Sequence, residues 1–329
     1  MNINKLKKIG VSALAGSLVS FAANAADFSV SGGASLTIDK TAESKGGTVT
    51  QGDSLKFNAS GETDGGLSIA AYFEMDGDDA GFDDRYISFG NADMGTVKFW
   101  GHGGSSVMSQ FDDISPKAYE EITDVTTSSD ATAVSADTVI GGIGNDNMFE
   151  YTSPSFAGVT LKAAMNTASG DSTVNNNKYS DIGVSISPEM VEGLTVYYAA
   201  GTNEATAGTD TDVSTMAVKY AYGPITVSYQ ESESDVAGST DDDEVEQFGV
   251  SYTVSDELSI SYGTRERDYN TASTTGDGNL TQEDTGFGIS YTMGGVAIKA
   301  QSNSSDNIAG GNTAQDDEES TSVSISFAF

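Results

Sequence analysis

The chain has 329 residues, and its 49 Asp and Glu against 15 Lys and Arg give a net charge of −34. A protein of that sign repels nucleic-acid phosphates, so the composition rules against a nucleic-acid-binding protein. Cysteine is absent, which excludes disulfides and thiolate metal sites.

The first 25 residues have the pattern of a cleavable secretory signal. Three lysines lie within the first eight residues, and an apolar run from about Ile9 to Ala23 ends in the cleavage motif Ala23-Asn24-Ala25. A short apolar run is also compatible with a buried helix. We expect residues 1–25 to be removed and residues 26–329 to form the mature domain, with a net charge of −37 (−34 − 3).

The mature chain contains no apolar stretch near the roughly 18 residues of a transmembrane helix, so any membrane crossing must use strands. It consists of short segments that alternate polar and apolar residues, joined in turn by tight turns and long polar connections. Sixteen strands are predicted, near residues 27–38, 53–62, 66–75, 84–91, 95–102, 146–153, 158–166, 179–187, 193–202, 213–222, 224–231, 245–254, 257–267, 284–293, 295–302 and 320–329. An even strand number with both ends on the turn side is typical of a closed antiparallel transmembrane β-barrel, and this all-β fold is our prediction.

The polar face of these strands distinguishes a membrane barrel from a soluble β-sandwich. In residues 158–166, for example, Val159 and Leu161 alternate with Thr160 and Lys162. The inner faces of a sandwich are apolar, whereas here charged and hydroxylated side chains follow one face of each strand. Such a face is what the wall of a water-filled lumen requires.

The last predicted strand, residues 320–329, ends on an aromatic residue. Val323, Ile325, Phe327 and Phe329 share one strand face, and serines occupy most of the other. This segment resembles the closing strand of bacterial outer-membrane barrels, in which a terminal Phe is the assembly signal. We therefore assign that role to Phe329 and expect residues 27–38 to lie beside the last strand.

Three segments carry a more specific resemblance: Leu55–Glu62 with the turn at 65–67, Arg85–Gly90 with the turn at 95–97, and YTSPSFAG at 151–158. They are similar to strands and hairpins of the general diffusion porins of Gram-negative outer membranes, and the likeness covers nearly the whole mature chain. It implies a homotrimer of 16-stranded barrels through which small hydrophilic solutes and ions diffuse, without a cofactor.

The resemblance also implies a cellular setting. The chain would be exported through the periplasm, inserted by the barrel-assembly machinery, and surrounded by outer-membrane lipid and lipopolysaccharide.

Residues 102–146 form a predicted third loop, far longer than the usual hairpin connection of about 2–5 residues. In the porin family this loop folds into the barrel and narrows it, with acidic residues opposite a basic wall. The candidate loop acids are Asp112, Asp113, Glu120, Glu121 and Asp124. The candidate wall cations are Lys56, Arg85 and Lys98, continued by Lys162, Lys219, Arg265, Arg267 and Lys299. A solvated surface loop is the alternative interpretation.

Arg85 is the residue on which resemblance and periodicity disagree. The resemblance places it on the pore wall, but it shares strand parity with Ile87 and Phe89, which by strict alternation turns it away from the lumen. A β-bulge would reconcile the two.

The acidic residues suggest the ion selectivity. Glu62, Glu74, Glu150 and Asp181 share the predicted lumen face with the wall cations, and most other acids lie in clusters assigned to the loops, such as 241–244. Acids at a pore mouth concentrate cations, so we predict a weak cation preference.

Metal binding and catalysis have little support. Acidic loops such as 76–81 offer oxygen ligands for weak Ca²⁺ binding, but this segment lacks the later acids of an EF-hand. The only histidine, His102, lies where the fifth strand enters the third loop and has no partner carboxylate at matching parity, and the catalytic motifs of hydrolases and kinases are absent, so an enzyme is not expected. A substrate-selective channel of the same fold and an exported acidic surface protein or adhesin remain the alternative functions.

Overall fold

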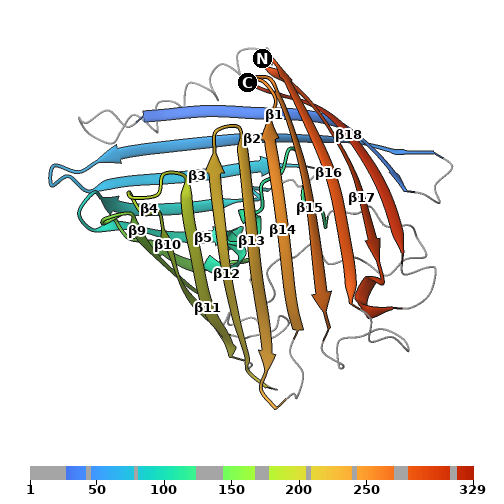
Figure 1. Cartoon of the computed structure of the whole chain (residues 1–329). Helices are drawn as coiled ribbons and strands as arrows, with labels where there is room; N and C mark the ends of the chain where they lie inside the picture. The colour runs from blue at the N-terminus through green and yellow to red at the C-terminus, as the bar shows by residue number, and fades with distance from the viewer. Residues whose placement is uncertain are drawn as a thin grey trace, which may run out of the picture.

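The computed structural model describes residues 27–41, 46–77, 81–123, 144–166, 178–204, 209–238, 243–269, 281–311 and 317–329. Within these ranges sixteen strands close into one antiparallel barrel (Figure 1), as predicted. The predicted signal segment, residues 1–25, lies outside the described residues. No helix in the described ranges is long and apolar enough to cross a membrane.

The wall strands follow the predicted order. They are β1 (Asp27–Thr41), β2 (Thr48–Glu62), β3 (Ser68–Asp76), β4 (Arg85–Asn91), β5 (Gly95–His102), β8 (Met148–Thr152), β9 (Val159–Asn166), β10 (Lys178–Ile186), β11 (Leu194–Glu204), β12 (Thr211–Tyr222), β13 (Ile225–Val236), β14 (Asp243–Thr253), β15 (Leu258–Asp268), β16 (Gln282–Met293), β17 (Val296–Asp306) and β18 (Glu318–Ala328). The other elements are the small sheet β6 (Gly104–Ser105) with β7 (Gly144–Asn145), helix α2 (Val107–Gln110), and the 3-10 helices η1 (Asp112–Ile114) and η2 (Ile308–Gly310).

The barrel closes between its first and last strands, as expected. β1 pairs with β18 from Gly33 opposite Ala328 to Thr41 opposite Ser320. Phe329 continues this pairing, because its N–H donates to the Gly32 carbonyl (2.9 Å) and its carbonyl accepts from the Gly32 N–H (2.8 Å). A Cβ on Gly32 would lie 2.8 Å from the Phe329 ring, so the absence of a side chain there admits the terminal aromatic.

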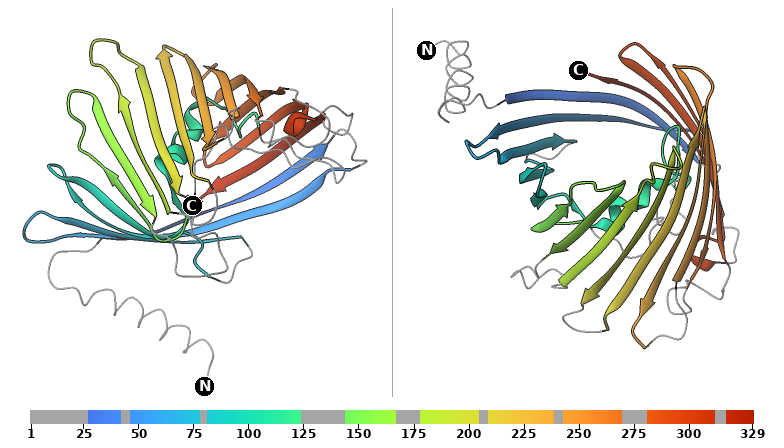
Figure 2. Two further views of the ribbon diagram at one scale, coloured as in Figure 1. Left: turned by 90° about the horizontal axis from the view of Figure 1, so that it is seen from below. Right: turned by 60° about the vertical axis from the view of Figure 1, so that its left-hand side comes forward.

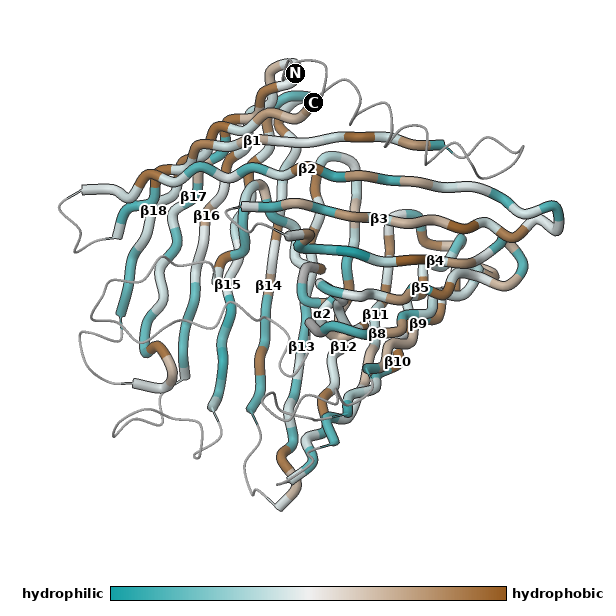
Figure 3. The backbone as a smooth tube through the Cα atoms, turned by 180° about the vertical axis from the view of Figure 1, so that it is seen from behind, coloured by the Kyte–Doolittle hydropathy of each residue, from teal (hydrophilic) through white to brown (hydrophobic). Residues whose placement is uncertain are grey.

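The barrel is apolar outside and polar inside, the reverse of a soluble protein. On β10, for example, the neighbours Asp181 and Ile182 are 6% and 59% exposed. Figure 3 shows hydrophobic and hydrophilic residues interleaved along the strands. The exposed apolar face is suited to lipid, and the buried polar face surrounds the lumen.

Several strands extend beyond their predicted ends. β2 begins at Thr48 instead of residue 53, β13 reaches Val236 instead of 231, and β14 begins at Asp243. Residues 243 and 244 were therefore wrongly assigned to a loop. Glu233 and Asp235 in the β13 extension and Glu244 in β14 alternate with residues that face the lumen, Asp243 among them, so the backbone ladder continues where the sequence is highly polar.

Candidate functional site

The loop after β5 enters the barrel, where Figure 2 shows α2 inside the ring of strands. Ser106 caps α2 by accepting a hydrogen bond from the Ser109 N–H. Val107 and Met108 are fully buried, and the Met108 N–H donates to Asp181 on β10 at 2.9 Å. The first part of the loop is thus fixed to the inner wall.

From α2 the loop continues across the inner wall towards β17. Gln230 on β13 donates to the Phe111 carbonyl (2.9 Å), and Ser261 on β15 accepts from the Ala118 N–H (2.8 Å). Asn303 on β17 donates to the Glu121 carbonyl (3.0 Å). Residues 106–121 of the predicted third loop therefore lie against the inner wall of the barrel, which agrees with a constriction and not with a solvated surface loop.

Glycines on the inner wall make room for this loop. A Cβ on Gly249 of β14 would lie 2.3 Å from Ser115 Oγ, and one on Gly183 of β10 would lie 2.5 Å from a methyl group of Val107. A Cβ on Gly286 of β16 would lie 2.7 Å from Ile122. Sequence reasoning missed this role, because a glycine in a strand does not by itself reveal what approaches it.

The predicted loop acids occupy different environments. Asp112 begins η1, close enough to Arg265 on β15 to act on it electrostatically. Glu120 is exposed, and its backbone N–H donates to Gln301, whereas the carboxylate of Glu121 pairs with Lys117 at 3.2 Å on the loop itself. Of Asp113 only the backbone, within η1, is described, and Asp124 lies outside the described residues.

Two predicted wall cations form ion pairs with neighbouring wall acids. Lys56 Nζ on β2 lies 3.2 Å from Glu74 on β3, and Lys98 Nζ on β5 lies 3.6 Å from Glu150 on β8. Each pair is also a cross-strand neighbour in the sheet register. The two positive charges are therefore largely compensated where they stand.

The arginines of β15 form a second group of paired charges on the inner wall. Arg265 lies 3.1 Å from Asp284, and neither side chain is exposed. Arg267 lies 3.2 Å from Asp243 and stacks over Tyr269, with 4.5 Å from the guanidinium carbon to the ring centre. These arginines are structural partners of wall acids.

The three remaining predicted wall lysines lie on β9, β17 and β12. Lys162 on β9 donates to the side-chain oxygen of Gln110, at the end of α2. Lys299 on β17 lies 5.6 Å from the centre of the Tyr119 ring on the loop. Lys219 lies on β12 opposite Ser228, and so on the inner face.

The model of one protein family matches residues 10–279 of this chain, which is most of its length, and the description of that family is Gram-negative porin. The chain belongs to this family. A 16-stranded barrel with a loop folded inside is thus an outer-membrane porin channel. No curated protein matches the chain in sequence.

Solved porins share the fold of this porin at low sequence identity. The loop-deleted OmpT of Vibrio cholerae aligns with TM-score 0.67 and 16% identity over 93% of this chain and 100% of its own. An anion-selective porin from Comamonas acidovorans aligns with TM-score 0.67 and 14% identity over 93% of this chain and 100% of its own. A trimer form of V. cholerae OmpT aligns with TM-score 0.66 and 14% identity over 93% of this chain and 100% of its own.

Arg85 does not join the basic wall of this porin. It lies opposite Phe73 of β3, which belongs to the outer face, and its guanidinium donates to the carbonyls of Phe82 and Gly101. A register shift does occur between Arg85 and Tyr86, but it displaces the β5 partner and leaves Arg85 on the outer face. The placement inferred from the resemblance was wrong, and strict alternation was right.

An aromatic row on the inner faces of β3, β4 and β5 was not predicted. The Tyr72 and Tyr86 rings stack with their centres 5.1 Å apart, and the Trp100 ring lies edge-on to Tyr86 at 4.7 Å. Lys98 Nζ lies 4.7 Å from the centre of the Tyr86 ring, and Trp100 donates to Glu150 at 3.0 Å. The row is visible only once the three strands are in register.

His102 has carboxylate neighbours, contrary to the prediction. Its Nδ1 lies 3.8 Å from Asp83 Oδ1 and its Nε2 lies 3.7 Å from Asp146 Oδ1. Ligand atoms of His102, Asp83 and Asp84 lie within 4.8 Å of one another. Burial, with the charges of Asp83 and Glu74, raises the pKa of the Asp84 carboxyl. These groups come from different hairpins, so strand parity was the wrong test.

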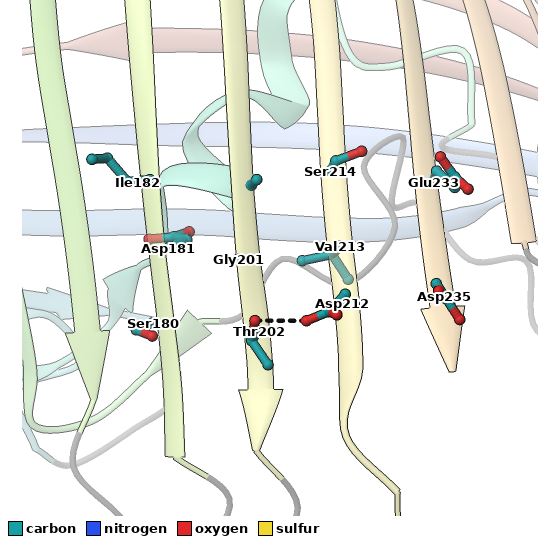
Figure 4. Close-up of a pocket in the computed structure, with 11 residues that line it drawn as sticks. Ser180, Asp181, Ile182, Gly201, Thr202, Asp212, Val213, Ser214, Glu233 and Asp235 are labelled. Atoms are coloured by element: carbon teal, nitrogen blue, oxygen red, sulfur yellow. Dashed lines mark hydrogen bonds between the residues drawn. The ribbon is translucent and has the colours of Figure 1, made fainter. Parts of the chain in front are cut away.

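The outer face carries rows of acids near the long connections. Figure 4 shows one part, a groove in which Asp212, Glu233 and Asp235 lie near one another and Thr202 donates to Asp212 at 2.6 Å. Further round the barrel, five carboxylates are successive cross-strand neighbours, and we call them the acidic row: Glu231, Glu246, Glu266, Glu283 and Asp306. These residues are exposed, and the apolar outer belt lies on the turn side of the row.

Proposed function

We propose that this porin is a passive diffusion pore for small hydrophilic solutes and ions with a weak preference for cations. The observation that carries the proposal is the pairing of wall cations with wall acids. Lys56, Lys98, Arg265 and Arg267 each lie within 3.1–3.6 Å of a carboxylate. A wall paired in this way gives anions little advantage.

The remaining charge then decides the preference. One fixed charge about 7 Å from a permeating ion contributes about 0.6 kcal/mol in water-like surroundings, and salt screens it further. Lys162, Lys219 and Lys299 favour anions, while we expect the net charge of −37 on residues 26–329 (12 − 49) to make the pore mouths negative. We expect the negative potential at the pore mouths to outweigh these three lysines, so that cations permeate a few times faster than anions.

The test is the reversal potential of purified channels in a planar bilayer under a KCl gradient. The expected result is a potassium permeability a few times that of chloride, and this ratio should fall towards one in concentrated salt. A preference for chloride would overturn the cation proposal. The absence of any conductance would overturn the pore itself.

A substrate-selective channel is the second candidate, and the aromatic row favours it. The Tyr86 ring is already in contact with Tyr72, Trp100 and Lys98, which leaves little ring surface for a solute. We therefore expect liposome swelling rates for sugars to depend on solute size alone. One sugar that permeates much faster than others of its size would favour the second candidate.

We also propose a homotrimer in contact with lipopolysaccharide. One solved protein of the same fold, OmpT of V. cholerae, has a trimer form, and this supports the proposal. The acidic row, at the loop-side border of the apolar belt, is suited to divalent ions that bridge to lipid phosphates. Native electrophoresis before and after heating, with and without lipopolysaccharide, tests both parts.

A further inference from the structure

We propose that Asp83, Asp84 and His102 bind one divalent transition-metal ion at the start of the third loop (residues 102–146), which we call the constriction loop. Zn²⁺ is the ion that fits, because it takes imidazole nitrogen together with carboxylate oxygen. The three ligand atoms already lie within 4.8 Å of one another. Asp83 and Asp84 belong to the connection between β3 and β4, and His102 ends β5.

The surroundings of the His102 imidazole indicate a metal site and not merely an acidic surface. Its Nδ1 is buried and makes no hydrogen bond with any described residue, although Asp83 Oδ1 is only 3.8 Å away. Its Nε2 faces Asp146 Oδ1 at 3.7 Å. Both separations are too long for hydrogen bonds. In metal sites a histidine typically presents one nitrogen to the ion and donates its other N–H to a carboxylate; Asp146 lies on the Nε2 side of His102, just beyond hydrogen-bond reach, where a small shift would complete this arrangement.

Gly103 makes the position of Asp84 possible. A Cβ at Gly103 would lie 1.6 Å from Asp84 Oδ1, and Gly103 has a φ of +72° that other residues rarely adopt. The Asp84 carboxylate therefore approaches the backbone beside His102 only because position 103 has no side chain. This geometry is specific to the chain and separate from the charge of the acids.

The ligands need only a small contraction to close around an ion. Ligand atoms of a tetrahedral site with bonds of about 2.0–2.1 Å are about 3.4 Å apart. Asp83 and Asp84 repel each other without a cation, which keeps the group open. A bound ion would fasten the start of the constriction loop to the β3–β4 connection and, through Asp146, to the segment that leads out of the loop into β8.

The test uses the full barrel folded in detergent, stripped with EDTA and titrated with Zn²⁺. Because the chain has one histidine, its imidazole NMR signals report on this site alone. We expect one Zn²⁺ per chain with these signals shifted. His102→Gln and Asp83→Asn should each weaken this binding at least about tenfold, and Asp146→Asn should weaken it by about 10- to 100-fold.

Two further variants separate the site from general acidity. Gly103→Ala keeps every ligand but displaces Asp84, so it should also weaken binding, with heat-modifiable electrophoresis confirming that the barrel has formed. Asp256→Asn, in the turn between β14 and β15, should bind Zn²⁺ as the wild type does. Unshifted histidine signals, or wild-type affinity in His102→Gln, would overturn the proposal.

Discussion

The guanidinium of Arg265 lies 3.1 Å from the carboxylate of Asp284 on the inner wall of the barrel, and both side chains are completely buried. Asp284 also accepts hydrogen bonds from Gln282 and Ser305. A buried ion pair of this kind stabilises little relative to an apolar pair, but the loss of one partner leaves an uncompensated charge.

Asp284→Ala should therefore destabilise the barrel by about 3–5 kcal/mol, because Arg265 would remain buried without this partner. Reversible urea unfolding in lipid vesicles measures the change. Lys178→Ala is the matched control, since its pair with Glu204 (2.8 Å) is half exposed and should cost under about 1 kcal/mol. Equal losses in both variants would contradict the argument.

Gly249→Ala should lower single-channel conductance. The new methyl group would meet Ser115 Oγ at 2.3 Å and move the loop away from the wall, into the opening. Conductance in planar bilayers tests this expectation, with Gly46→Ala as the control because a Cβ there meets nothing within 4 Å. Unchanged conductance in Gly249→Ala would show that the loop can yield without narrowing the pore.

Glu150→Gln should shift selectivity towards anions. The substitution removes the carboxylate 3.6 Å from Lys98 and leaves the lysine charge uncompensated on the inner wall. One such charge is worth about 0.6 kcal/mol at about 7 Å and acts with opposite sign on cations and anions, so the cation-to-anion permeability ratio should fall by up to about eightfold in dilute salt and by less where salt screens the charge. Reversal potentials measure the shift, and Glu257→Gln, in the turn between β14 and β15, should leave the ratio unchanged. A rise in the ratio would argue against the pairing.

Glu246→Gln should stabilise the barrel. Glu246 lies between Glu231 and Glu266 in the acidic row, and like charges directly opposite each other cost about 0.2–1 kcal/mol per pair. The gain should shrink when Mg²⁺ or salt is added, because the added ions screen the repulsion. Urea unfolding at two salt concentrations provides the measurement, and a loss of stability in low salt would contradict the prediction.

Deletion of Phe329 should impair assembly. The deletion removes two hydrogen bonds to Gly32 and a ring that lies 6.4 Å from that of Phe327, at the point where the barrel closes. The measurement is the yield of the heat-modifiable form in the outer-membrane fraction. Phe156→Ala removes an exposed aromatic in the hairpin between β8 and β9 and should assemble normally. Normal assembly without Phe329 would remove its assigned role.

The strands could be predicted because lipid and lumen impose a strict two-residue period on them. The order Leu55, Lys56, Phe57, for example, is sufficient to assign Lys56 to the lumen face and its two neighbours to the lipid face. The ends of the strands were harder to predict. The acids of β13 and β14 are as polar as a loop, yet β13 continues to Val236 and β14 begins at Asp243.

The site was harder to predict than the strands, because it depends on register and on contacts between distant hairpins. Nothing local in the sequence pairs Arg265 with Asp284 or brings Asp83 to His102. Arg85 shows the opposite case, in which local alternation was sufficient and the resemblance misled. The positions of Asp112 and Glu120 on the loop could be read from the sequence, but their partners on the wall could not.

The pairing of the inner-wall cations also limits the distance over which their charges act on a solute. A lysine or arginine held about 3 Å from a carboxylate acts as a dipole, and the field of a dipole decays more steeply with distance than that of a single charge. A solute on the axis of the opening would feel little of Lys56 with Glu74 or Lys98 with Glu150, while a solute that touches the wall would meet both signs at once. Such a wall orients polar molecules at close range without attracting ions of either sign from afar.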